Sequence, residues 1–387
     1  MTGFFTSPRV AWGPGALEQL SGLGARRALV VVDASVAHRA GERRAVEELA
    51  KSETHVELVV DPESPDRVES VRALTTRIAA YGPDWIVAIG GGATIDGAKA
   101  ARLWAERPDL GIEQLTPLQE WPEPARSRLV AIPTTSGSGA EASWAADLVG
   151  SDGAPIELAH RALTPDWALV DASLAAGLTP DRVADGGFEA LALAVEAYVS
   201  AWSNPFSDAL AVDAAATVVR RLPHALRWSD DPDAKAALHY AATLAGLAAS
   251  NAQRGVAHAL ARALRGPTGL SYGRLTGILL PLALEFDHPS ARDRLEALGR
   301  AVAPTDEDGR GPVPLPARVR RLAETVRLPL SLRAAGVEGD GVLAQREAIV
   351  SNALRSPAVL ANPRVPTRDD LLALLGAAVG PPGDRPP

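Results

Sequence analysis

Three consecutive glycines, Gly90, Gly91 and Gly92, stand between a strand-like run and a helix-like segment in DWIVAIGGGATIDGAKA. Glycine lets the backbone approach a ligand closely, and the N-terminus of a following helix offers free N–H groups to a phosphate. A tight turn between a strand and a helix explains the same three residues equally well. The glycine run therefore predicts a phosphate site or a plain turn.

A second unusual loop, AIPTTSGSGAEAS over residues 131–143, favours the phosphate site. It too follows a strand-like run, and in an open α/β sheet ligands bind at the carboxyl ends of the strands. Its glycines alternate with hydroxyl groups that suit phosphates or a nicotinamide ribose, namely Thr134, Thr135, Ser136, Ser138 and Ser143.

Asp33 ends the first strand-like run, ALVVVD. A carboxylate at this place can accept hydrogen bonds from the 2′-hydroxyl of an adenosine ribose and repels a 2′-phosphate. The sequence therefore favours NAD(H) over NADP(H).

The elements that carry these loops change character along the chain. Before Pro180, short β-branched runs alternate with helical segments, which indicates parallel strands joined by helical crossovers. These runs span residues 28–33, 55–60, 84–90, 128–133 and 167–171. After Pro180 the segments become rich in Ala and Leu and are separated by NP, DDP and RGPTG. We predict an α/β domain over residues 1–180 and a helical domain over 181–387.

Composition excludes several classes of function. The chain has 387 residues, 47% hydrophobic content, no Cys and a net charge of −8. The lack of Cys excludes disulfides and thiolate metal sites. An acidic balance without a basic run argues against nucleic-acid binding, and no apolar run is long enough to cross a membrane. Since no secretory signal is visible, we expect a cytoplasmic protein with a small-molecule partner.

The motifs, taken in order, identify a family. GGGATID, PTTSGSGAE, GFEALALAVEAYVS, SNPFSDALA, HALARAL, ILLP and ANPRVPTRDDL follow one another as in the iron-containing (group III) alcohol dehydrogenases, which this chain resembles over nearly its whole length. The resemblance implies an N-terminal Rossmann-like domain that binds NAD(P), an all-helical C-terminal domain and a homo-oligomer. It assigns the cofactor to Asp33, Gly90, Gly91, Gly92, Asp96, Thr134, Thr135, Ser138 and Ser143.

The same resemblance reveals a departure. Members of that family hold Fe²⁺ or Zn²⁺ with one Asp and three His. Here the corresponding positions carry Glu189, Leu193, His258 and Tyr272. Leucine cannot ligate, and a tyrosine phenol is a poor ligand for these ions unless it is deprotonated. We therefore expect no divalent metal.

The helix-like segment around His258 suggests what takes the place of the metal. In SNAQRGVAHALARALRG, Arg254, His258 and Arg262 recur at every fourth position, so a continuous helix would place them on one stripe. Two guanidinium groups beside an imidazole suit an anionic substrate, whereas a solvated surface stripe explains the same spacing. Both interpretations stay open.

Two functions follow from these patterns. The first is a metal-independent NAD(P)(H)-linked alcohol dehydrogenase or carbonyl reductase. In it His258 or Tyr272 donates the proton, Arg262 assists, and Arg254 and Glu189 contact the substrate. The alternative is a scaffold adapted to non-redox chemistry, such as cyclisation, elimination or isomerisation, or to ligand binding alone. For Tyr272, a buried tyrosine that fills the vacated volume is an equally good explanation.

Overall fold

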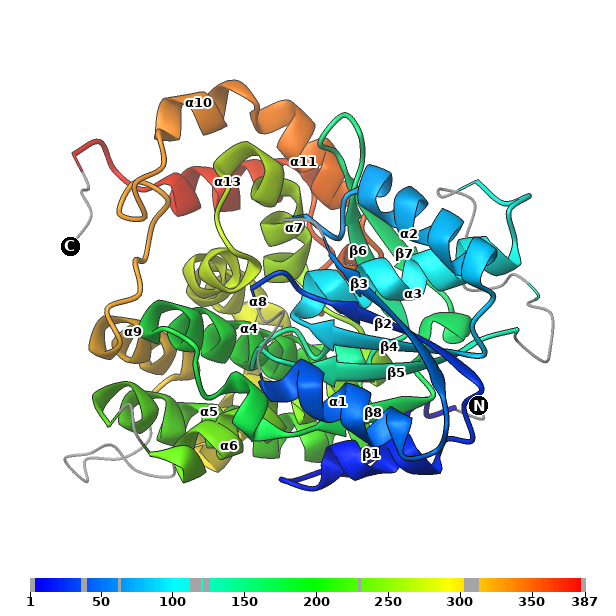
Figure 1. Cartoon of the computed structure of the whole chain (residues 1–387). Coiled ribbons are helices and arrows are strands. Elements are labelled where there is room, and N and C mark those ends of the chain that lie inside the picture. The colour runs from blue at the N-terminus through cyan, green and yellow to red at the C-terminus, as the bar shows by residue number, and fades with distance from the viewer. Residues whose placement is uncertain are drawn as a thin grey trace. The chain divides into compact units, whose positions relative to one another are not determined.

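The computed structural model describes residues 4–35, 40–61, 64–111, 120, 126–228, 231–302 and 313–383. The chain divides into two compact units (Figure 1). The first comprises Met1–Thr135 and Gly139–Gly177, and the second comprises Ser136–Ser138 and Leu178–Pro387.

A six-stranded parallel sheet forms the centre of the first unit, in the order β1-β8-β5-β4-β2-β3. Its strands are β1 (Arg9–Trp12), β2 (Arg27–Val32), β3 (His55–Val60), β4 (Trp85–Gly90), β5 (Arg128–Pro133) and β8 (Trp167–Val170). The sequence predicted five of them, all except β1. That strand has only four residues, lies at the edge of the sheet and has no fully buried residue, so its apolar run is too short to mark it as the others are marked.

Helices cover both faces of this sheet, because successive side chains of a strand point to opposite faces. Leu29 and Val31 pack in one core with α2 (Val68–Tyr81) and α3 (Gly92–Glu106). Val30 and Val32 pack in another core with α1 (Ala40–Ala50) and the 3-10 helix η1 (Ala16–Gly22). The predicted Rossmann-like α/β arrangement is confirmed (Figure 1).

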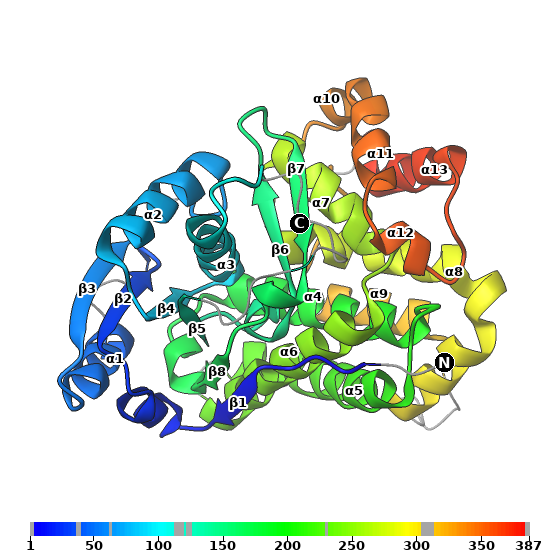
Figure 2. The same cartoon turned by 90° about the vertical axis from the view of Figure 1, so that its right-hand side faces the viewer.

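An antiparallel hairpin, β6 (Ala145–Val149) and β7 (Pro155–Ala159), forms a separate two-stranded sheet in the first unit. Figure 2 shows these two strands standing apart from the larger sheet and beside α3.

Within its described residues, the second unit contains helices and no strand, as predicted. They are α4 (Pro180–Val199), α5 (Pro205–Arg227), α6 (Pro232–Ala252), α7 (Val256–Thr268), α8 (Tyr272–Val302), α9 (Leu315–Thr325), α10 (Gly339–Ala344), α11 (Arg346–Leu354), α12 (Ala358–Ala361) and α13 (Arg368–Val379). One apolar core joins α4, α5, α6, α9 and part of α8, and a second joins α7 to α11, α13 and the start of α8.

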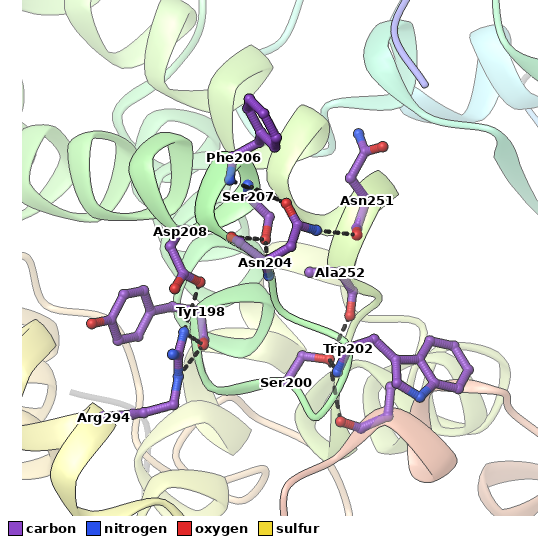
Figure 3. A network of polar contacts seen from close by, with 11 residues as sticks. Tyr198, Ser200, Trp202, Asn204, Phe206, Ser207, Asp208, Asn251, Ala252 and Arg294 are labelled. Atoms are coloured by element: carbon purple, nitrogen blue, oxygen red, sulfur yellow. Dashed lines mark hydrogen bonds and ion pairs between the residues drawn. The ribbon is translucent and has the colours of Figure 1, made fainter. Parts of the chain in front are cut away.

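The turn sequences mark where these helices begin. Asn204 caps α5 by accepting hydrogen bonds from two backbone N–H groups of its first turn, and Ser207 reciprocates (Figure 3). Asp231 caps α6 in a similar way. In both cases proline follows at the first helical position, where its missing N–H costs nothing. Two helices therefore begin at the NP and DDP sequences that separate the segments rich in Ala and Leu.

None of the helices in the described ranges combines the length and apolar character needed to span a membrane.

Candidate functional site

The glycine run forms an uncapped helix N-terminus. Strand β4 ends at Gly90, and Gly91 is the N-cap residue of α3, with an extended backbone (φ −76°, ψ −176°). Since glycine has no side chain to cap the helix, the first N–H groups of α3 stay available for a ligand. The first turn carries no acidic residue that would repel an anion. This geometry suits a phosphate.

The other predicted cofactor loop lies directly beside this terminus. Strands β4 and β5 are paired, and the Thr134 N–H donates to the Gly90 carbonyl oxygen over 3.0 Å. A Cβ on Gly91 would lie 3.4 Å from Thr135 Cγ2, and a Cβ on Gly90 would lie 2.9 Å from Asp33 Cβ. The structure therefore brings these five predicted residues together at the carboxyl ends of three neighbouring strands.

Asp61, which sequence reasoning missed, joins this cluster. It directly follows β3 as Asp33 follows β2, and its N–H donates to the Val32 carbonyl oxygen. The pKa of Asp61 is raised from 3.8 to about 7, mainly by burial. The charge of Asp33 also raises this pKa, and a hydrogen bond from Thr94 opposes the rise. Asp33 and Asp61 each directly follow one of two adjacent strands, and this shared position in the sequence could have predicted that Asp61 belongs to the cluster.

Asp96 and Ser143, both predicted to bind the cofactor, meet at the buried Lys99. The Lys99 Nζ lies 3.3 Å from Asp96 Oδ1, 3.0 Å from Ser143 Oγ and 2.8 Å from the Ala145 carbonyl oxygen. Burial raises the pKa of Asp96 to about 6, against the lowering effect of Lys99, and burial lowers the pKa of Lys99 itself. These groups tie α3 to the start of the hairpin.

The middle of the second loop, residues 136–138 including the predicted Ser138, groups with the helical unit. The Ser136 hydroxyl forms a 3.0 Å hydrogen bond with His239 Nδ1 on α6, and both side chains are buried. A Cβ on Gly137 would lie only 2.8 Å from Glu189 Oε2 on α4. Glu189 therefore lies against this loop, and His239 is a further polar contact that the sequence did not indicate.

His258 is held from one side by a carboxylate. Its Nδ1 donates to Glu196 Oε2, while Glu196 Oε1 accepts the Ala257 N–H over 2.7 Å. The His258 side chain is 2% exposed, and its Nε2 has no hydrogen-bond partner among the described residues. The Tyr272 ring centroid lies 5.6 Å from that of His258, and its hydroxyl donates to the His258 carbonyl oxygen.

The predicted stripe of Arg254, His258 and Arg262 is wrong in one position. Helix α7 begins at Val256, so Arg254 lies in the turn between α6 and α7. The left-handed backbone of Gln253 (φ 72°) interrupts the helical path that the spacing assumed. The surface alternative is wrong for the other two residues, because His258 and Arg262 are both buried.

Comparison with known proteins identifies the chain. A family model for iron-containing alcohol dehydrogenase matches residues 7–172, and the C-terminal model of the Fe-containing alcohol dehydrogenase family matches residues 183–379. The chain belongs to the iron-containing alcohol dehydrogenase family. The predicted family and enzyme class, an oxidoreductase, are therefore confirmed.

Three similar proteins align with this chain over almost their full length. The NADPH-dependent butanol dehydrogenase of Clostridium saccharobutylicum is 29% identical, with 95% of each chain covered. The probable alcohol dehydrogenase EutG of Salmonella typhimurium is 30% identical, over 97% of this chain and 94% of its own. The iron-containing alcohol dehydrogenase of Thermococcus thioreducens has a TM-score of 0.87 at 28% identity, over 97% of this chain and 99% of its own. The Clostridium saccharobutylicum relative is named as dependent on NADPH.

The four positions that correspond to the metal ligands of the family do not form a ligand set here. Leu193 is 4% exposed and belongs to the apolar core around α4, and Tyr272 packs against the core around α7. Within the described ranges, no group of three or more His, Cys, Asp or Glu side chains is placed to hold a metal. Because protein sites for these ions generally use three or more ligands, the residues present do not fit the metal of the family.

Proposed function

We propose that this protein is a metal-independent, NAD(H)-linked alcohol dehydrogenase or carbonyl reductase that acts on a small substrate. One contrast carries the proposal. The glycine turn and the uncapped α3 terminus retain the form of a phosphate site, while two of the four ligand positions have become Leu193 and Tyr272.

The cofactor would be held by residues of the first unit. The free N–H groups of α3 and the close backbone approach at Gly90 and Gly91 suit a pyrophosphate. Asp33 suits a ribose with a free 2′-hydroxyl, which supports NAD(H), although the butanol relative is named for NADPH. When bound, the cofactor supplies hydride chemistry. The chain must then orient the substrate and move a proton.

His258 is the best candidate for the group that moves the proton. Its Nδ1 is engaged by Glu196, whereas its Nε2 is buried without a partner among the described residues. Tyr272 is the weaker candidate, because its hydroxyl proton is already donated to the His258 carbonyl oxygen. A positioned acid or base contributes about 10²–10⁴ in rate, which would partly compensate for a missing Lewis acid.

The substrate would be a small alcohol or the corresponding carbonyl compound. The Clostridium saccharobutylicum relative is named for butanol, which supports this size. Arg262 lies on α7 four residues after His258, about one helical turn away, and a guanidinium at this place supports an anionic group on the substrate.

Two measurements test the proposed function. NADH is titrated against the purified protein and its fluorescence is followed, and NADH consumption is then measured with short-chain aldehydes and keto acids in metal-free buffer. We expect saturable binding and substrate-dependent oxidation of NADH. Absence of binding at millimolar NADH would contradict the proposal and favour non-redox chemistry on this scaffold.

A further inference from the structure

Glu196 on α4 accepts two hydrogen bonds at the start of α7, one from the backbone and one from a side chain. Its Oε1 accepts the Ala257 N–H over 2.7 Å, which satisfies one of the backbone donors that every helix start leaves open. Its Oε2 accepts a hydrogen bond from His258 Nδ1. Glu196 and His258 are both 2% exposed, so little water competes for these bonds. Capping alone would explain the first contact but not the second.

The start of α7 has a second cap, Asn362. Asn362 Oδ1 accepts the Val256 N–H over 3.0 Å, and both protons of its amide are used, by Asp287 Oδ1 and by the Arg364 carbonyl oxygen. Asn362 and Glu196 cap two different backbone donors, the N–H groups of Val256 and Ala257. The helix start therefore has two caps, and only one of them contacts the imidazole.

The contact with Glu196 decides where the imidazole proton lies. A carboxylate only accepts hydrogen bonds, so the proton between the two groups belongs to Nδ1. In the neutral ring Nε2 then carries a lone pair. A buried polar atom with no partner requires an explanation, and a catalytic role is one of the recognised ones. Nε2 meets this description among the described residues.

We propose that Glu196 is a positioning residue that fixes His258 as the Nδ1–H tautomer and thereby makes Nε2 the acceptor for the hydroxyl proton of the alcohol. This inference rests on the proposed function. In the oxidation direction the O–H bond breaks, its proton moves to Nε2, and its electron pair forms the C=O bond. The carbinol C–H bond breaks with its electron pair, and the hydride reduces NAD⁺. The substrate is oxidised by two electrons, and carbonyl reduction is the reverse.

Glu196→Gln separates positioning from capping. The glutamine carbonyl oxygen can still accept the Ala257 N–H, but its amide then faces Nδ1 with a donor. His258 must turn Nδ1 into an acceptor and carry its proton on Nε2, the wrong tautomer for accepting a proton. We expect kcat for alcohol oxidation to fall about 100-fold or more, with KM and NADH affinity nearly unchanged.

Asn362→Ala is the matched control, because it removes the other cap of α7 without touching His258. It should lower the melting temperature and leave kcat within about twofold of the unmodified enzyme. If Glu196→Gln keeps full kcat, or if Asn362→Ala loses as much kcat, Glu196 is only a structural cap and the inference is wrong.

A measurement on the unmodified protein keeps the test independent of folding and of activity. ¹⁵N NMR of histidine-labelled protein, assigned with a His258→Gln sample and by through-bond proton coupling, reports which ring nitrogen of His258 carries the proton. A proton on Nδ1 alone is expected, and a neutral ring with its proton on Nε2 would overturn the inference. If the unmodified protein binds no NADH, the proposed function fails separately, whatever the tautomer.

Discussion

At the scale of single residues, Gly91 offers a test in which stability and binding change in opposite directions. Its extended backbone suits a helix N-cap, where serine is among the preferred residues. In Gly91→Ser the hydroxyl should cap α3 and stabilise the fold by a few tenths of a kcal/mol. The same hydroxyl occupies the N–H groups that a pyrophosphate would use. We expect NADH affinity, measured by calorimetry, to fall at least about tenfold, which is about 1.4 kcal/mol.

Gly22→Ser is the control for this substitution. It adds the same side chain in the same unit, at a place where no atom lies within 4 Å of the new Cβ. It should leave NADH affinity unchanged. Equal affinity in the Gly91→Ser protein would show that GGGATID is only a structural turn.

The raised pKa of Asp287 predicts how the free energy of unfolding depends on pH. Burial raises its pKa from 3.8 to about 8, an effect that the hydrogen bond from Asn362 opposes and the charge of Glu196 increases. At pH values between 3.8 and about 8, Asp287 is ionised in the unfolded chain and protonated in the folded chain. The stability from this group is therefore complete below about pH 4 and is lost as the pH rises through 8. The slope is about 1.4 kcal/mol per pH unit.

Asp287→Asn should remove that slope, because the amide oxygen still accepts from Asn362 and no longer titrates. Urea unfolding at pH 5 and at pH 7 measures the effect as a difference between the variant and the unmodified protein. This comparison cancels the contributions of Asp61 and Asp96, which act in the same direction. Parallel pH dependence in the two proteins would mean that Asp287 is ionised in the folded state.

At the scale of elements, the buried Lys99 joins α3 to the hairpin. It is fully buried and paired with Asp96, and it donates to Ser143 and to the Ala145 carbonyl oxygen. Lys99→Met would leave Asp96 as a buried carboxylate without its cation, which typically costs about 3–5 kcal/mol. Urea unfolding should show this loss. The double variant Lys99→Met with Asp96→Asn should recover part of it.

Lys51→Met is the matched control, since Lys51 is 59% exposed and pairs with Glu48 on α1 of the same unit. An exposed pair of this kind contributes less than about 1 kcal/mol. A cost for Lys99→Met as small as that for Lys51→Met would show that the buried pair does not hold the hairpin in place.

The helices and strands also show which features of the fold local sequence patterns can predict. The strands at 55–60 and 128–133 were predicted to the residue, because a short run of β-branched and aliphatic residues between turn signals is a local pattern. The start of α7 was placed too early by the spacing of Arg254, His258 and Arg262. It depends on caps supplied by Glu196 and Asn362, which are 61 and 106 residues away along the chain from the N–H groups they accept. Periodicity alone extended the helix back to Arg254.

At the scale of the whole molecule, the same limit explains which site contacts were missed. The cluster of Asp33 with the glycine turn followed from topology, since parallel strands end at one edge of the sheet. The pairs Ser136 with His239 and Glu196 with His258 join residues 103 and 62 positions apart. Nothing in the local pattern of either partner specifies such a contact, because it forms only when helices pack. The resemblance to a family identified His258 but not the carboxylate that holds it.

Metal content is the prediction that concerns the molecule as a whole. The protein as isolated should contain well under one equivalent of Fe or Zn, and prolonged chelation should leave activity and melting temperature unchanged. Glu189 and His258 alone provide two ligands, which rarely retain a divalent ion against water, whereas a full site stabilises the fold by mass action. Elemental analysis and thermal melts with and without chelator measure both quantities.

Restoration of the ligand set is the converse test. Leu193→His together with Tyr272→His places one carboxylate and three imidazoles at the family positions, and Leu193→His alone is the control with one ligand fewer. We expect the double variant to bind Zn²⁺ and to melt at a higher temperature when Zn²⁺ is added, because the ion binds only the folded state. The Nε2 of His258 would then gain a partner. A stoichiometric metal in the unmodified protein would contradict this account. It would mean that ligands from elsewhere in the chain reach His258, and that its Nε2 is a metal ligand and not a proton acceptor.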